Sequence, residues 1–188
     1  MNIDLYIEIF GALTGIVYVA LEIMKRRSMW MVGILTSLVY IYIFVQNGFY
    51  AMAVLNIYYV AISLYGWWRW KVAPDVCRIP KRTALFCVLF TGLIFFFLTF
   101  VLNRFTDAPM PYADALITAL SIVATWMLSQ SYLEQWWVWI VANLLAVGVY
   151  GWQGLYPTMA LFLAYTVAAA VGYKRWLNLL GKNRSNKN

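Results

Sequence analysis

The residues best suited to chemistry in this sequence are the tryptophans and the asparagine of WWVWIVAN, residues 136 to 143. At about 100° per residue, Trp136, Trp139 and Asn143 share one stripe of a helix. Trp137 points elsewhere. An indole ring can stack on a flat ligand, and an amide both donates and accepts hydrogen bonds. The spacing therefore predicts the wall of a binding site for a small flat molecule, with an aromatic belt at a membrane surface as the alternative.

A second stripe of the same kind runs from residue 56 to residue 70. One helical face there carries Asn56, Tyr59, Ser63, Trp67 and Trp70. An amide inside a hydrocarbon layer needs a hydrogen-bond partner, which can be a ligand or a side chain of a neighbouring helix. Asn56 and Asn143 therefore each have two interpretations, a substrate contact or an interhelical hydrogen bond.

The composition is that of a membrane protein, because 64% of the 188 residues are hydrophobic and 11% are charged. A helix needs about 20 apolar residues to cross a bilayer, and the sequence provides that length seven times. The predicted spans are 3 to 24, 29 to 46, 50 to 69, 83 to 102, 113 to 130, 136 to 152 and 156 to 176. We therefore predict an all-α integral membrane protein that forms a single membrane domain, residues 1–188.

The net charge of +7 does not indicate nucleic-acid binding, because the basic residues gather at the ends of the predicted spans. Basic loops remain in the cytoplasm, so we expect the N-terminus outside, the C-terminus inside and a basic cytoplasmic tail at 178–188. The turn near Glu134 is also predicted inside, although it contains no basic residue. The sequence has no histidine and no phosphate-binding glycine loop, so we expect no metal site, no cofactor and no ATP hydrolysis.

An internal repeat appears when the sequence is shifted by 106 residues. The matched pairs include Trp30 with Trp136, Gly48 with Gly154, Tyr59 with Tyr165, Gly66 with Gly172 and Trp70 with Trp176. We predict a first three-helix repeat at 1–71, a linker helix at 82–104 and a second repeat at 112–177. The linker makes the two repeats parallel, an arrangement common in transporters, whose substrate sites lie between repeats near the membrane midplane.

The repeat also pairs Trp139 with Gly33 and Asn143 with Ser37. We expect a ligand to lie closer to the helix that carries Trp139, and Gly33 and Ser37 to permit close packing or motion. Asp114 is predicted near the outer surface, either at an entrance or at a solvated helix end. An enzyme is disfavoured because no catalytic carboxylate pair and no nucleophile with a base is visible. A scaffold, which would need only packing, is the other alternative.

Taken together, these features resemble the PnuC family of bacterial vitamin transporters. The resemblance rests on the pattern W-x-x-W-x-x-x-N at Trp136, Trp139 and Asn143, on DALITALSIVATWML at 114 to 128, on NIYYVAISLYGWWRW at 56 to 70 and on QGLYPTMALFLAY at 153 to 165. It implies a three-one-three helical fold like that of SWEET sugar transporters. It also implies facilitated diffusion across the bacterial inner membrane, a homotrimer, and a cytoplasmic kinase that phosphorylates and traps the vitamin.

Nicotinamide riboside is the leading substrate that this resemblance implies, and thiamine is the alternative. Trp136 and Trp139 are candidates for a stacking platform under a flat cationic ring. Asn143, Asn56 and Tyr59 offer hydrogen bonds to hydroxyl groups. Trp67 and Tyr165 complete the predicted set of substrate-binding residues. Because thiamine also has a flat cationic ring, the residues alone do not separate the two vitamins.

Overall fold

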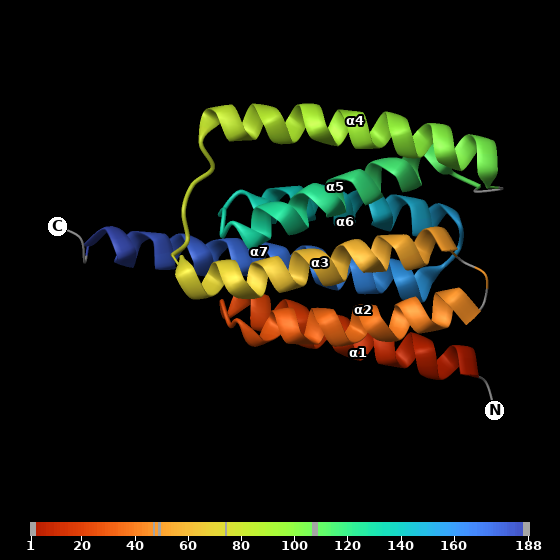
Figure 1. The fold of residues 1–188 in the computed structure, drawn as a ribbon, viewed down its shortest axis with the longest axis horizontal. Coiled ribbons are helices and arrows are strands. Elements are labelled where there is room, and N and C mark those ends of the chain that lie inside the picture. Colours follow the sequence, from red (N-terminus) through yellow and green to blue (C-terminus); the bar gives the residue numbers. More distant parts are fainter. Residues whose placement is uncertain (1–2, 47, 49, 74, 107–108, 186–188) are drawn as a thin grey trace. The chain divides into compact units, whose positions relative to one another are not determined.

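Seven α-helices make up most of the computed structural model, which describes residues 3–46, 48, 50–73, 75–106 and 109–185 (Figure 1). The helices are α1 (Ile3–Ile23), α2 (Ser28–Gln46), α3 (Tyr50–Val72), α4 (Lys81–Phe105), α5 (Pro111–Ser129), α6 (Gln135–Trp152) and α7 (Tyr156–Ser185). The described residues contain no strand, only an isolated parallel bridge between Cys77 and Tyr132. The predicted all-α class is therefore confirmed.

Each predicted span coincides with one helix, and six of the seven agree with the structure within three residues at both ends. The exception is α7, which continues to Ser185 through most of the predicted tail; residues 186–188 lie outside the described part. Trp176 and Leu180 are buried, so an apolar helical face persists beyond the predicted end. By length and composition, four helices in the described part can cross a membrane: Ser28–Gln46, Lys81–Phe105, Pro111–Ser129 and Tyr156–Lys182.

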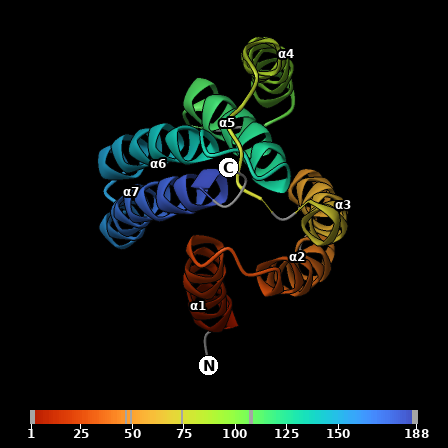
Figure 2. The same ribbon diagram turned by 90° about the vertical axis from the view of Figure 1, so that its left-hand side faces the viewer.

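The chain folds into two units, residues 1–75 and 76–188. In the first unit, α2 packs against both α1 and α3. In the second, α4 packs on α5, α5 on α6 and α6 on α7 (Figure 2). The predicted linker helix, α4, thus belongs to the same unit as the second repeat, while α1 to α3 form the first.

The turns repeat with the same offset of 106 residues. Lys25 and Ser131 both adopt a left-handed backbone, with φ of 57° and 62°, which is uncommon for residues other than glycine. Each ends its helix in a Schellman motif, in which the next residue's N–H, at Arg26 or Tyr132, donates to the carbonyl oxygen five residues earlier. Gly48 and Gly154 are a second left-handed pair, with φ of 75° and 74°.

The packing between the last two helices of each repeat follows the same offset. In each repeat a tryptophan lies edge-on to a second tryptophan and covers a glycine of the following helix. These residues are Trp30, Trp70 and Gly66 in the first repeat, and Trp136, Trp176 and Gly172 in the second. Ring centroids are 5.3 Å apart in the first pair and 5.5 Å in the second. The four indole rings are buried, so they form the fixed core of each helix pair.

Candidate functional site

Two polar groups that lie one turn apart on helix α6, the Trp139 indole N–H and the Asn143 amide, have no hydrogen-bond partner within the described residues. The indole N–H of Trp139 is buried, and the part of the chain that the structure describes supplies no hydrogen bond to it. Asn143, one turn later on the same face, is 5% exposed, and no hydrogen bond to its side-chain amide is found within the described residues. The predicted pairing of Trp139 with Asn143 on one stripe is thus present in the structure, and both groups can bind a polar ligand.

Trp136 has different surroundings from Trp139, although the sequence placed both in one platform. Its ring lies edge-on to Trp176 and against Gly172, and it is 1% exposed. Its indole N–H also has no hydrogen-bond partner within the described ranges, and the same holds for Trp30, the equivalent residue of the first repeat. Because the same arrangement occurs in both repeats, we assign Trp136 to packing that supports α6.

An aromatic chain links α6 to Tyr165 on α7. Tyr150 stacks on Phe162 with centroids 5.3 Å apart, and Phe162 lies edge-on to Tyr165 at 6.0 Å. Tyr150 comes seven residues after Asn143 and so falls on the same helical stripe, a signal that the sequence analysis did not use. Asp114 lies in the first turn of α5 and is half-buried.

The predicted residues of α3 lie in the first unit and have partners there. The Asn56 amide donates to the carbonyl oxygen of Met52 at 2.9 Å, which leaves its side-chain oxygen for another donor. The ring of Tyr59 lies 5.5 Å from that of Tyr58. Trp67 is covered on one face by the Arg27 guanidinium, 4.4 Å from the ring centroid.

Arg27 therefore occupies one of the two surfaces that Trp67 could offer to a flat cation. The same guanidinium donates to the carbonyl oxygen of Trp67 at 3.0 Å. Within the first unit, the structure places Asn56 and Tyr59 three residues apart on α3, with Trp67 two turns beyond Tyr59. Trp67 thus has a structural partner of its own, whereas a substrate contact for it remains a prediction.

Gly33 and Ser37 lie on α2 in close packing. A Cβ at Gly33 would lie 3.1 Å from the Ser63 hydroxyl oxygen and 3.1 Å from the Tyr18 ring. Ser37 is 6% exposed. Of the two roles predicted for these positions, close packing describes the surroundings of Gly33, because Tyr18 of α1 and Ser63 of α3 meet at it.

Where Gly33 lies in the first repeat, the two repeats place their large and small side chains on opposite helices. Tyr18 and Gly33 of the first repeat correspond to Ala124 and Trp139 of the second, again at an offset of 106. In the first repeat the large side chain comes from α1, and in the second it comes from α6. Ala124 is fully buried. Trp139 therefore has no indole counterpart in the first repeat, where Tyr18 fills the corresponding level.

This exchange predicts that a second substitution can recover stability lost through a first. Gly33→Trp alone should lower the free energy of unfolding by about 1 to 3 kcal/mol or more, because the new ring meets Tyr18 and Ser63. Adding Tyr18→Ala should recover part of this loss, since it recreates the pairing of the second repeat. Unfolding in detergent measures the stability of the single and the double variant. Gly92→Trp is the matched control, because a Cβ there meets no atom of the described residues within 4 Å. A double variant that is no more stable than Gly33→Trp would contradict the exchange.

Comparison with known proteins agrees with this architecture. Residues 5–178 match the sequence profile of the nicotinamide mononucleotide transporter family. The nicotinamide riboside transporter PnuC of Escherichia coli K12 is 26% identical over 204 residues, which cover 92% of this chain and 85% of that protein. The nicotinamide riboside transporter PnuC of Neisseria mucosa is 22% identical, covering 97% of this chain and 76% of that protein.

A solved structure has the same fold. The crystal structure of the vitamin B3 transporter PnuC superposes with a TM-score of 0.75 and 22% sequence identity. The match covers 96% of this chain and 84% of that chain. The arrangement of seven helices is therefore shared along almost the whole chain.

Proposed function

Because the chain belongs to the nicotinamide mononucleotide transporter family, we propose that it carries nicotinamide riboside across the membrane by facilitated diffusion. Membership makes it a multi-pass membrane transporter and not an enzyme. The proposal concerns its substrate and mechanism. Relatives from two bacteria that are named nicotinamide riboside transporters support the choice of substrate.

The observation that carries the proposal is the buried Trp139 N–H next to the Asn143 amide on α6, two groups to which the described residues give no hydrogen bond. A buried N–H without a hydrogen bond costs roughly 1 to 3 kcal/mol, and a low-dielectric membrane provides no water to offset that cost. The Trp139 indole N–H and the Asn143 amide lie one turn apart on one face. A bound molecule that accepts hydrogen bonds from both groups would remove this cost. An aromatic ring on the same molecule can stack on the Trp139 ring.

Nicotinamide riboside has the chemistry that this face requires. Its pyridinium is a flat cation, and a cation over a tryptophan ring gains up to about 2 kcal/mol when desolvated. Its carboxamide and ribose hydroxyls can accept from the Trp139 N–H and exchange hydrogen bonds with Asn143. We propose Asn56, Tyr59 and Tyr165 as further polar contacts. Trp136 supports α6 by packing against Trp176, and Trp67 has one ring face for the substrate because Arg27 covers the other.

Parallel titrations test the substrate. Quenching of tryptophan fluorescence in purified protein is expected to be saturable with nicotinamide riboside and absent with riboflavin. Thiamine, which also contains a flat cationic ring, is the competing ligand in the same assay. Uptake of labelled nicotinamide riboside into proteoliposomes without a nucleotide or an imposed ion gradient is expected to equilibrate and then stop. Binding and uptake of thiamine alone would reassign the substrate, and the absence of both would reject the proposed site.

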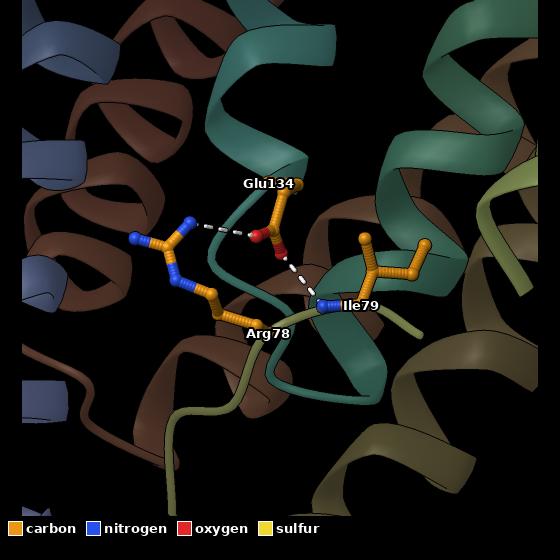
Figure 3. Close-up of polar contacts among 3 residues, drawn as sticks. All are labelled: Arg78, Ile79 and Glu134. Carbon is orange, nitrogen blue, oxygen red and sulfur yellow. Dashed lines mark hydrogen bonds and ion pairs between the residues drawn. The ribbon is translucent and has the colours of Figure 1, made fainter. Parts of the chain in front are cut away.

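We also propose the cellular arrangement that the sequence predicted. The protein would lie in the inner membrane with its N-terminus outside and the basic 178–188 segment in the cytoplasm, act as a homotrimer, and depend on a cytoplasmic kinase to trap the vitamin. One contact supports the assignment of the Glu134 turn to the basic side. Arg78, from the basic loop before α4, lies 3.4 Å from Glu134, so a basic residue does reach this turn (Figure 3).

A further inference from the structure

A short segment between α3 and α4 is fastened to the turn between α5 and α6. We define this strap as residues 76–79. The Cys77 N–H donates to the carbonyl oxygen of Ser131 at 3.1 Å, and the Leu133 N–H donates to the carbonyl oxygen of Cys77 at 2.9 Å. These two bonds form the parallel bridge between Cys77 and Tyr132. Val76, at the start of the strap, is 4% exposed, so the segment is also held by apolar burial.

Glu134 completes the attachment through its carboxylate. One carboxylate oxygen accepts the Ile79 backbone N–H at 2.9 Å, and the other pairs with the Arg78 guanidinium at 3.4 Å (Figure 3). The Arg78 side chain is half exposed, so the ion pair by itself contributes little. The hydrogen bond from Ile79 is short and charge-assisted, so it is the stronger of the two contacts.

The position of Glu134 connects this attachment to the proposed binding face. Glu134 immediately precedes α6, whose first residue is Gln135. Trp139 follows five residues later, about 7.5 Å along the helix axis, and Asn143 follows about 6 Å beyond that. Because a helix moves as a rigid element over such distances, a shift of its first turn would move both side chains.

The equivalent turn of the first repeat is fastened in another way. Lys25 and Arg27 place their charges over tryptophan rings of α3, with the Lys25 Nζ 3.1 Å from the Trp70 centroid and Arg27 over Trp67. In the second repeat these two positions are Ser131 and Leu133, which have no charge. These two positions of the second turn therefore cannot form the cation–π contacts of the first, and the strap is attached to this turn.

We propose that the strap stays attached throughout the transport cycle and that Glu134, through it, is a positioning residue for the substrate contacts of α6. This inference rests on the proposed function, since it concerns the affinity for nicotinamide riboside. It assigns a role to a residue that contacts no substrate. It also predicts that the end of α6 near Glu134 is a fixed support and not a gate.

Substitutions at Glu134 test the positioning role in the full-length protein. Glu134→Ala removes both contacts and is expected to weaken nicotinamide riboside binding about tenfold, because binding must then also fix the loosened first turn of α6. Glu134→Gln keeps an oxygen for the Ile79 N–H and is expected to lose less affinity. Arg82→Gln is the control, since it also removes a charge from this region and Arg82 forms no ion pair within the described residues.

A disulfide tests whether the strap remains attached. Paired strands lie about 4.8 Å apart, within the range of Cα separations that a disulfide spans, so Tyr132→Cys should bond to Cys77 on oxidation. Cys87→Ala removes the other thiol. The oxidised protein is expected to transport as fast as the same protein after reduction. In the Glu134→Ala background, oxidation is expected to restore the lost affinity, which a general loss of stability would not explain.

The outcomes separate this inference from the proposed function. If the unsubstituted protein does not bind nicotinamide riboside, the proposed function fails before the strap is tested. If it binds but Glu134→Ala has unchanged affinity, Glu134 is not a positioning residue. If oxidation of the cysteine pair stops transport, the strap must detach during the cycle and the inference is overturned. Failure of oxidation to restore affinity in the Glu134→Ala protein would likewise contradict it.

Discussion

Replacing Trp139 with alanine is expected to weaken nicotinamide riboside binding by roughly 5- to 150-fold, because stacking a base on an aromatic ring contributes about 1 to 3 kcal/mol. Trp139 offers both a ring and a buried indole N–H that has no partner among the described residues. Trp139→Phe should retain part of the stacking and lose the hydrogen bond, giving an intermediate affinity. Titration of purified protein by calorimetry measures both, independently of tryptophan fluorescence.

Trp137→Ala is the matched control for this substitution. Trp137 lies on the same helix but is 53% exposed, and its ring packs against Tyr173 instead of the Asn143 stripe. Its removal should leave the affinity unchanged. Equal losses for the Trp137 and Trp139 variants would mean that α6 tryptophans support the fold in general, and the binding face would have to be placed elsewhere.

Gly172→Ala is expected to lower the free energy of unfolding by about 1 to 3 kcal/mol or more, because the added methyl group would overlap the Trp136 ring. Trp136 cannot move away easily, since it is buried and Trp176 lies against it. Gly66→Ala should have a similar effect in the first repeat, where Trp30 occupies the equivalent position. Thermal or denaturant unfolding in detergent, with expression level as a second measure, tests both.

Gly148→Ala is the control for these glycine substitutions. A Cβ at Gly148 has nothing within 4 Å, although the residue also lies inside a helix. Alanine is favoured over glycine there by about 1 kcal/mol, so this variant should be at least as stable as the natural protein. If Gly172→Ala were equally well tolerated, Trp136 would not be locked against α7, and its assignment to packing would be wrong.

The sequence was sufficient for the membrane class, the seven helices and the repeat. Apolar runs of spanning length identify helices directly, because backbone groups in hydrocarbon must be satisfied within their own segment. The offset of 106 residues found in the sequence recurs in the left-handed turns at Lys25 and Ser131 and in the edge-on pairs of Trp30 and Trp136. Helical spacing also placed Trp139 and Asn143 on one face, since that depends only on the pitch of the helix.

Only the tertiary structure separated the roles of residues on that face. Trp136 and Trp139 fall on one stripe, and neither indole N–H has a partner within the described residues, yet the Trp136 ring is held edge-on to Trp176 and against Gly172, as the Trp30 ring is held in the first repeat. Helical spacing says which residues share a face, but not which neighbouring helix supplies a partner to each.

The strap was also beyond prediction from the sequence. Arg78 and Glu134 are 56 residues apart, and Cys77 and Tyr132 form a bridge across a similar separation. No local pattern marks such contacts, because their geometry depends on how α4 and α5 pack and on where the turn after α5 ends. The sequence by itself determined which helices form and which residues share a face; packing between distant segments decided which of those residues are enclosed by a neighbouring helix.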